Sequence, residues 1–175
     1  MKTTGFQLSL VDLKRTEGAT KDFSFSAGME QTLEVGLVSV PVGRQITVHG
    51  QLQSVGEGVL VTGEFHTEVD AQCSRCLKQT NSPVEARIEE LYIYSDKAEG
   101  YDQQDVLFIH QEMVDLDQPI RDGLILEQPL IPLCDPDCLG LCQHCGLEMN
   151  SQPTHTHDDD IDSRWLSLGQ WGKMS

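Results

Sequence analysis

Six cysteines constrain this chain more than any other feature, because they form two groups that lie far apart in the sequence. The first group is the pair Cys73 and Cys76. The second group places four cysteines within twelve residues: Cys134, Cys138, Cys142 and Cys145. Two of the spacings are C-x2-C, in which a tight turn directs two thiolates at one tetrahedral ion. The pattern predicts a bound metal, zinc, that joins distant segments of the chain.

Two other interpretations of the cysteines compete with a metal site. Six free or buried thiols need no metal, and a C-x2-C pair can form a catalytic disulfide. A redox dithiol usually precedes a helix in a βαβ unit, whereas the residues before Cys73 alternate as strands do. The N-terminus lacks the continuous apolar run of a signal peptide, which favours a cytoplasmic protein with reduced thiols. Reduced C-x2-C pairs favour metal over disulfides.

Two histidines raise the number of candidate ligands to eight, which is enough for two tetrahedral sites. The candidate metal ligands are Cys73, Cys76, Cys134, Cys138, Cys142, Cys145, His155 and His157. One partition joins Cys73 and Cys76 to Cys134 and Cys138, and leaves Cys142, Cys145, His155 and His157 for a second site. Another partition joins the two C-x2-C units directly. The sequence alone does not choose between them.

The other histidines and the acidic run after His157 suggest little chemistry. His155-Thr-His157 followed by Asp160 resembles the clusters that hold catalytic zinc in metallohydrolases. No further histidine follows the aspartates, so a solvated acidic loop is the better interpretation. We expect His144 to be exposed and not to bind metal. His49, His66 and His110 lie on expected strands and are interpreted as surface or half-buried residues.

Residues 30 to 94 have the pattern of β-structure. Apolar side chains alternate with polar or small ones through Leu33, Val35 and Leu37, and again through Ile46, Val48 and Leu52. Gly56-Glu-Gly58 predicts a hairpin turn, after which strict alternation continues from Val59 to Ala71. Cys73 is therefore expected to end a long strand, with Ser74-Arg75 turning the chain. Asn81-Ser-Pro83 then leads into a return strand from Val84 to Tyr94, which places Cys73 and Cys76 at the tip of a β-hairpin.

The remainder of the chain predicts less regular structure. Residues 95 to 105 form an acidic loop, residues 106 to 109 a short strand, and Asp117 caps a helix with Pro119 in its first turn. Leu116, Ile120 and Leu124, with Ile125 beside them, form the apolar stripe of that helix, and Pro129 ends it. Residues 130 to 160 have too few apolar side chains to hold a shape without a cross-link. Ile161, Trp165 and Leu168 suggest a last short helix that docks on the body.

These elements predict the fold class and the domain organisation. We expect an α+β fold: a mainly antiparallel β body with a short helix and a cysteine-rich, zinc-ribbon-like C-terminal segment. The expected division is a β-rich body over residues 1–129, which includes the first C-x2-C unit, and a metal-binding segment over residues 130–175. Low apolar content, 38%, makes a structural metal useful because the core is thin.

Charge limits the class of partner. The formal net charge is −16, from 28 acidic and 12 basic residues, and no lysine or arginine lies between Arg121 and Arg164. A zinc finger that reads nucleic acid needs basic residues to neutralise phosphates, so the sequence argues against direct nucleic-acid binding by this segment. The acidic surface instead favours basic proteins. The residues expected to attract such a partner are Asp96, Glu99, Asp102 and Asp105, together with the acidic C-terminal segment. No apolar run approaches the about 20 residues of a membrane span.

The chain resembles the YceD family of bacterial and plastid proteins over residues 70 to 168 or so. The matching segments are Cys73-Ser-Arg-Cys76-Leu77, residues 116–126, Pro132-Leu-Cys134, residues 137–142, Cys145-Gly146-Leu, Asn150 and Asp162-Ser-Arg-Trp165. The resemblance implies a role in accumulation or processing of large-subunit ribosomal RNA, and it brings no catalytic residue. Many cysteine-rich relatives carry a late Cys-x-Cys where this chain has His155-Thr-His157, and histidine also binds zinc. Some relatives lack most of the later cysteines, which implies that the metal stabilises the protein.

The function expected from the sequence is therefore that of a non-catalytic ribosome-assembly factor. It would support synthesis, processing or stability of large-subunit (23S) ribosomal RNA and fold around structural zinc. Its partner would be a basic ribosomal protein or a large-subunit assembly intermediate. Two alternatives stay open at this point: a zinc-ribbon adaptor in another complex, and a thiol- or zinc-dependent enzyme.

Overall fold

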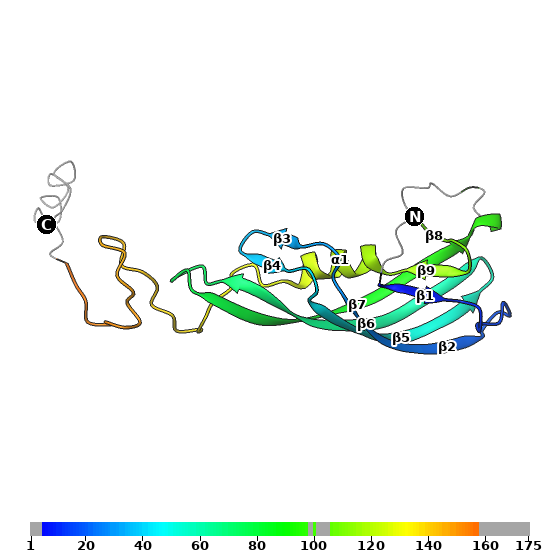
Figure 1. The fold of residues 1–175 in the computed structure, drawn as a ribbon, viewed down its shortest axis with the longest axis horizontal. Helices are drawn as coiled ribbons and strands as arrows, with labels where there is room; N and C mark the ends of the chain where they lie inside the picture. Colours follow the sequence, from blue (N-terminus) through cyan, green and yellow to red (C-terminus); the bar gives the residue numbers. More distant parts are fainter. Residues whose placement is uncertain (1–4, 98–99, 101–105, 158–175) are drawn as a thin grey trace, which may run out of the picture.

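A long, curved antiparallel sheet dominates the structure, a computed structural model that describes residues 5–97, 100 and 106–157 (Figure 1). Three strands form its centre: β5 (Gln45–Val55), β6 (Gly58–Gln72) and β7 (Gln79–Tyr94). The flanking strands are β2 (Thr20–Gly28), β3 (Leu33–Val35), β4 (Val38–Val40) and β8 (Leu107–Ile109). A separate small sheet pairs β1 (Gln7–Ser9) with β9 (Met113–Asp115). Helix α1 spans Asp117–Glu127, and a 3-10 turn, η1, spans Ser95–Lys97.

The register of the central strands fixes which side chains share a face. Strand β6 pairs with β7 along its whole length, from Gly58 opposite Ile93 to Gln72 opposite Gln79. Its other edge pairs first with β5 and then, near Ala71, with β4. Strand β8 adds to β7 in parallel. Because side chains alternate along a strand, this register puts the apolar positions of β5, β6 and β7 on one face and the polar positions on the other.

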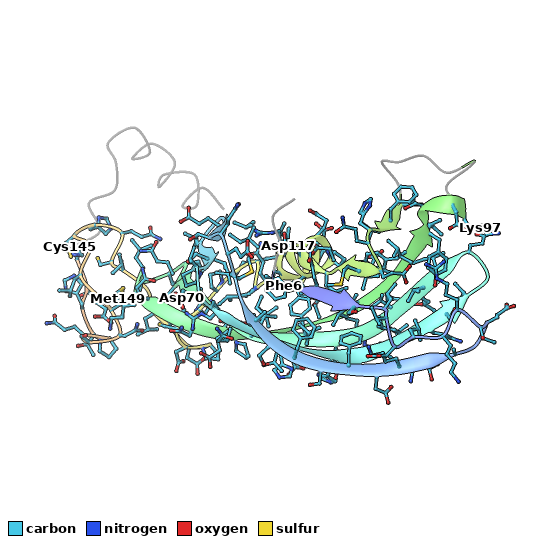
Figure 2. All side chains as sticks on the ribbon, turned by 45° about the vertical axis from the view of Figure 1, so that its right-hand side comes forward. Phe6, Asp70, Lys97, Asp117, Cys145 and Met149 are labelled. Atoms are coloured by element: carbon cyan, nitrogen blue, oxygen red, sulfur yellow. The ribbon has the colours of Figure 1, made fainter. Side chains whose placement is uncertain are left out.

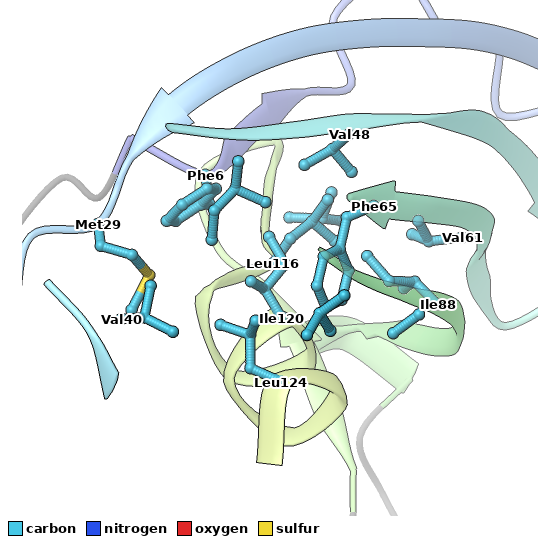
Figure 3. Packing of buried hydrophobic residues seen from close by; sticks show 14 of the residues in the cluster. Phe6, Met29, Val40, Val48, Val61, Phe65, Ile88, Leu116, Ile120 and Leu124 are labelled. Carbon is cyan, nitrogen blue, oxygen red and sulfur yellow. The ribbon is translucent and has the colours of Figure 1, made fainter. Parts of the chain in front are cut away.

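The apolar face of the sheet forms the core together with α1. Leu116, just before the helix, and Ile120 and Leu124 within it are buried in one cluster with Phe65 of β6 (Figure 3). Phe6, from the segment before β1, packs into the same cluster. Figure 1 shows α1, β1 and β9 on this side of the curved sheet. Burying each of these large side chains contributes about 1.5–3 kcal/mol.

Gly123 lets the helix approach the sheet closely. A Cβ atom at this position would lie 2.8 Å from Cε1 of Phe65 and 3.1 Å from the Cβ of Ala86. Glycine inside a helix costs about 1 kcal/mol relative to alanine. Here the close packing of α1 on the Phe65 ring explains why it is present.

The fold class is confirmed: a mainly antiparallel sheet with one helix among the described residues, followed by a cysteine-rich segment. Two details of the helix differ from expectation. Asp117 is its first helical residue and not its cap, which is Leu116; the N–H of Asp117 donates to Oδ1 of Asp115 (2.9 Å). Ile125 is exposed, since the stripe that faces the sheet follows Leu116, Ile120 and Leu124 only.

The alternating pattern found the central strands but missed the outer ones. Strands β1, β2 and β9 were not predicted. Strand β7 was predicted to start at Val84 but begins five residues earlier, at Gln79. Pro83 is accommodated inside β7.

The acidic residues Glu99, Asp102 and Asp105, and the predicted helix with Ile161, Trp165 and Leu168, lie outside the described residues. Within the described part of the chain, no helix is long and apolar enough to cross a membrane.

Candidate metal centres

The tip of the β6–β7 hairpin forms a tight turn around Cys73 and Cys76. The N–H of Leu77 donates to the carbonyl of Cys73 (2.9 Å), and the N–H of Cys73 donates to the carbonyl of Lys78 (2.8 Å). Leu77 takes a left-handed backbone conformation, φ 62°. The turn places both sulfur atoms on the same side of the hairpin tip, as predicted for a strand-end C-x2-C unit.

The second C-x2-C unit repeats this turn. The N–H of Gly146 donates to the carbonyl of Cys142 (2.9 Å), and the N–H of Cys142 donates to the carbonyl of Leu147 (2.8 Å). Gly146, with φ 71°, occupies the position that Leu77 occupies in the first unit. The left-handed region is free of strain for glycine and costs roughly 1–2 kcal/mol for other residues. The first turn thus adopts the same conformation with leucine in place of the glycine that favours it.

Four sulfur atoms from distant segments meet at the hairpin tip. The ligand atoms of Cys73, Cys76, Cys134 and Cys138 all lie within 4.8 Å of one another. Sγ of Cys73 is 3.9 Å from Sγ of Cys138, and Sγ of Cys76 is 3.5 Å from Sγ of Cys134. A tetrahedral ion with Zn–S bonds of about 2.3 Å separates its sulfurs by about 3.8 Å. This group of four, called the hairpin cluster below, therefore has the spacing of a zinc site with four thiolate ligands.

A second group of four forms further along the chain. Cys142, Cys145, His155 and His157 also bring their ligand atoms within 4.8 Å of one another. Nε2 of His155 and Nε2 of His157 each lie 3.3 Å from Sγ of Cys145, and 2.8 Å from each other. Two sulfurs and two imidazole nitrogens are a common zinc ligand set. This group is called the tail cluster below; Figure 2 shows Cys145 and Met149 at the end of the molecule opposite Lys97.

The thiols of the hairpin cluster differ in their pKa values. Backbone N–H groups directed at the sulfur, first that of Cys76, lower the pKa of the Cys73 thiol to about 6. The opposite happens at Cys134, whose thiol pKa is raised, chiefly through its hydrogen bond with Cys76. Asn150 and the N–H of Gly140 lower the pKa of Cys138. The surroundings thus favour the thiolate form at Cys73 and Cys138, and the thiolate is the form in which cysteine binds zinc.

Contacts beyond the ligands connect the two clusters and anchor them to the hairpin. Nη1 of Arg75 donates to the carbonyl of Cys138 (2.8 Å), and the carbonyl of Arg75 accepts from the N–H of Leu141 (3.2 Å). Lys78, next to the first turn, forms an ion pair with Glu148 and holds the pKa of that carboxyl below its usual value. The segment between the clusters is therefore tied to the hairpin at several points.

Asn150 makes the most direct contact with a ligand. Its Nδ2 donates to Sγ of Cys138 (3.3 Å), while its Oδ1 accepts from the N–H of Leu139 (2.7 Å). One amide thus orients the sulfur and the loop that carries it. The cysteine and histidine spacings identify candidate ligands only. They therefore did not predict Asn150, Arg75 or Lys78 as parts of the site.

We expect Asn150→Leu to weaken zinc binding at the hairpin cluster by about 10- to 100-fold, because a donor to a ligand sulfur is lost. Competition with a chromophoric chelator measures the affinity of each site. Gln152→Leu, a change at an exposed amide of the same segment, should bind zinc as the wild type does. Unchanged affinity in Asn150→Leu would show that this hydrogen bond does not tune the site.

The sequence left two groupings of the ligands open, and the structure has the first of them. Cys73 and Cys76 lie with Cys134 and Cys138, and the two C-x2-C units are not joined directly. His144 is exposed, as expected, with its ring 5.2 Å from that of His157. His49 is half-buried, whereas His66 and His110 are exposed. Asp160, the candidate partner of the two histidines in a hydrolase, lies outside the described residues. Both groups could hold a metal ion.

Fold and site together define a class: a curved antiparallel sheet whose central hairpin carries a ribbon-like segment with two four-ligand clusters. The chain matches, over residues 61–170, the model of the family described as large ribosomal RNA subunit accumulation protein YceD. It belongs to the YceD family, which supports a role connected with the ribosome.

Relatives with similar sequences carry no functional description. An uncharacterized protein of Mycobacterium tuberculosis is 34% identical over 163 residues, which cover 92% of this chain and 78% of that protein. An uncharacterized protein of Mycobacterium leprae is 33% identical over 134 residues, or 75% of this chain and 61% of the relative. No solved structure matches the chain at a significant level.

Proposed function

We propose that this protein is a non-catalytic ribosome-assembly factor that supports the synthesis, processing or stability of large-subunit (23S) ribosomal RNA. It folds around two structural zinc ions and binds a basic ribosomal protein or a protein-rich face of an assembly intermediate. The observation that carries the proposal is the membership of the YceD family, described as large ribosomal RNA subunit accumulation proteins. The cluster geometry and the charge of the chain support its mechanism.

The ligand sets favour structural over catalytic metal. Each cluster has four protein side chains within 4.8 Å of one another. Structural zinc sites are closed by four protein ligands, whereas catalytic sites keep a position for water or substrate. The thiolates and imidazoles of this chain would thus fill the coordination shell, and the metal would supply a cross-link between the hairpin tip and residues 134–157. An assembly factor needs a fixed shape for recognition and does not need an open metal.

Charge supports a protein partner in preference to naked RNA. The chain carries a formal net charge of −16, and the polar face of the sheet presents Glu64, Glu68 and Glu85 to solvent. Like charges repel phosphate backbones, while complementary charges steer association with cationic proteins. Of the predicted acidic residues Asp96, Glu99, Asp102 and Asp105, the structure describes Asp96, which lies in η1.

A depletion experiment tests the proposal. In cells that lack this protein, we expect the ratio of large- to small-subunit ribosomal RNA to fall, with precursors of the large-subunit RNA accumulating. Gel or sequencing quantification of both RNAs measures the ratio, and expression of the wild-type chain should restore it. An unchanged ratio in depleted cells would contradict the proposal. A chain that bound only naked RNA in a salt titration would contradict the partner class.

A further inference from the structure

The segment that carries the clusters places several large aliphatic side chains on the outside. This lobe comprises residues 73–78 and 130–157, all of them described. Its buried cluster consists of the cysteines Cys73, Cys76 and Cys138, with Leu133 and Leu141 partly buried against them. In contrast, four aliphatic side chains are largely exposed: Leu77 (52%), Leu130 (92%), Ile131 (69%) and Leu139 (53%). We call these four residues the apolar collar.

The backbone brings the members of the collar to one region of the lobe. The N–H of Ser74 donates to the carbonyl of Pro132 (2.9 Å), which holds the segment of Leu130 and Ile131 beside the first turn. Arg75 contacts the carbonyl of Cys138, the residue that precedes Leu139. The collar residues therefore belong to the chain segments that form the hairpin cluster. Single exposed aliphatic residues are ordinary, but several gathered on a small lobe without a large core are typical of an interaction site.

The backbone conformation of Leu77 is a second, independent feature of this surface. It holds a left-handed conformation with φ 62°, at the position where the equivalent turn has Gly146 with φ 71°. Glycine would relieve the backbone there without disturbing the turn. Residues with strained backbone conformations are concentrated at functional positions, where the surrounding structure holds the conformation in place. The Leu77 side chain is 52% exposed.

The charges around the collar specify its partner. Asp135 and Asp137 are exposed next to Leu139. The two basic side chains of the first turn are already engaged, Lys78 with Glu148 and Arg75 with backbone carbonyls. In the sequence, no lysine or arginine lies between Arg121 and Arg164. An aliphatic surface with acidic neighbours is complementary to a cationic segment that also carries aliphatic side chains.

We infer that the apolar collar is the docking surface for a lysine- and arginine-rich segment of a large-subunit protein, with aliphatic side chains of that segment packed against Leu77, Leu130, Ile131 and Leu139. The inference rests on the proposed function and names the surface that performs it. It also explains why the lobe needs metal: the ions hold the lobe together, so its aliphatic side chains remain available for the partner.

A binding experiment tests the inference. It uses the zinc-loaded 175-residue chain and the proteins extracted from purified large ribosomal subunits. We expect the immobilised wild type to retain a basic protein, identified by mass spectrometry. Leu77→Gly, and the double change Leu130→Ser with Ile131→Ser, should each weaken its affinity about tenfold or more. Zinc content should stay at the wild-type value, and Leu77→Gly should not lower the thermal midpoint, because glycine suits its backbone conformation.

Val11→Ser is the matched control, since Val11 is a 76% exposed aliphatic residue outside the lobe; it should bind as the wild type does. Wild-type affinity in both collar variants would overturn the surface while leaving the proposed function intact, because the RNA ratio in depleted cells reports on that function separately. Retention of no large-subunit protein would overturn the inference. A collar-dependent dimer in place of a basic partner, seen by analytical ultracentrifugation, would overturn it too.

Discussion

Replacing Cys138 by serine is expected to detach residues 130–157 from the sheet while the sheet itself stays folded. Cys138 is buried in the hairpin cluster, where its sulfur lies 3.9 Å from that of Cys73. The lobe has no large aliphatic core of its own, because its buried cluster is made of cysteines. Zinc binding to structural sites of zinc-finger peptides contributes about 10–16 kcal/mol, which is comparable to the stability of a whole domain. The sheet keeps its separate core around Phe65.

Metal analysis and limited proteolysis distinguish the two clusters. The wild type should contain two zinc ions, and Cys138→Ser should contain one and become sensitive to chymotrypsin after Leu133 and Leu139. Cys145→Ser is the matched control: it also loses one zinc, from the tail cluster, but should protect those two sites because the hairpin cluster remains. A wild type without zinc, or a Cys138→Ser variant with full zinc and full protection, would contradict the assignment.

Gly50→Val should destabilise the body by about 4 kcal/mol or more, an effect typical of a severe steric conflict. Gly50 lies directly opposite Gly63 in the β5–β6 ladder. A Cβ atom on Gly50 would lie 2.2 Å from the carbonyl oxygen of Thr62 and 2.6 Å from Cα of Gly63. These are backbone atoms at the centre of a sheet, so they cannot move aside independently. The paired glycines let two long strands approach and bend, and the Phe23 ring lies next to them.

Thermal unfolding measures this cost. A loss of about 4 kcal/mol lowers the midpoint of a protein of this size by about 10 °C. Gly56→Ala serves as the control, because a Cβ on Gly56, in the turn between β5 and β6, meets no atom within 4 Å. A Gly50→Val protein that melted with the wild type would show that the strands have room to separate at this point.

Local patterns predicted the parts of the fold in which one strand face is buried continuously. Val59, Val61 and Phe65 alternate with polar residues, and all three are buried on the face that meets α1. The patterns failed where burial is partial. In β2, Phe23 and Phe25 are only half-buried, and their alternation with serines is confined to a short run that ends at Ala27. Strands β1 and β9, of three residues each, are too short for any periodicity to appear.

For the candidate site too, some features were predicted from the sequence and others were not. The C-x2-C spacings predicted both turns, because a turn of this kind depends on neighbouring residues alone. The resemblance through Cys73, Cys138, Cys145 and Asn150 agreed with the family that the chain belongs to. Leu77 was not expected to take the conformation of Gly146, since leucine has no intrinsic preference for positive φ. Its turn is imposed by the hydrogen bonds of the hairpin tip.

The amino-acid sequence by itself determined the kind of ligands, the long central hairpin and the acidic character of this protein, because these depend on residue types and short spacings. Only the tertiary structure decided which cysteines meet. Cys76 and Cys134 are separated by 58 positions, and their approach depends on the length of β6 and β7, the packing of α1 against Phe65 and the path of residues 128–133. Contacts between distant segments arise from the packing of the whole chain, and no local spacing encodes them.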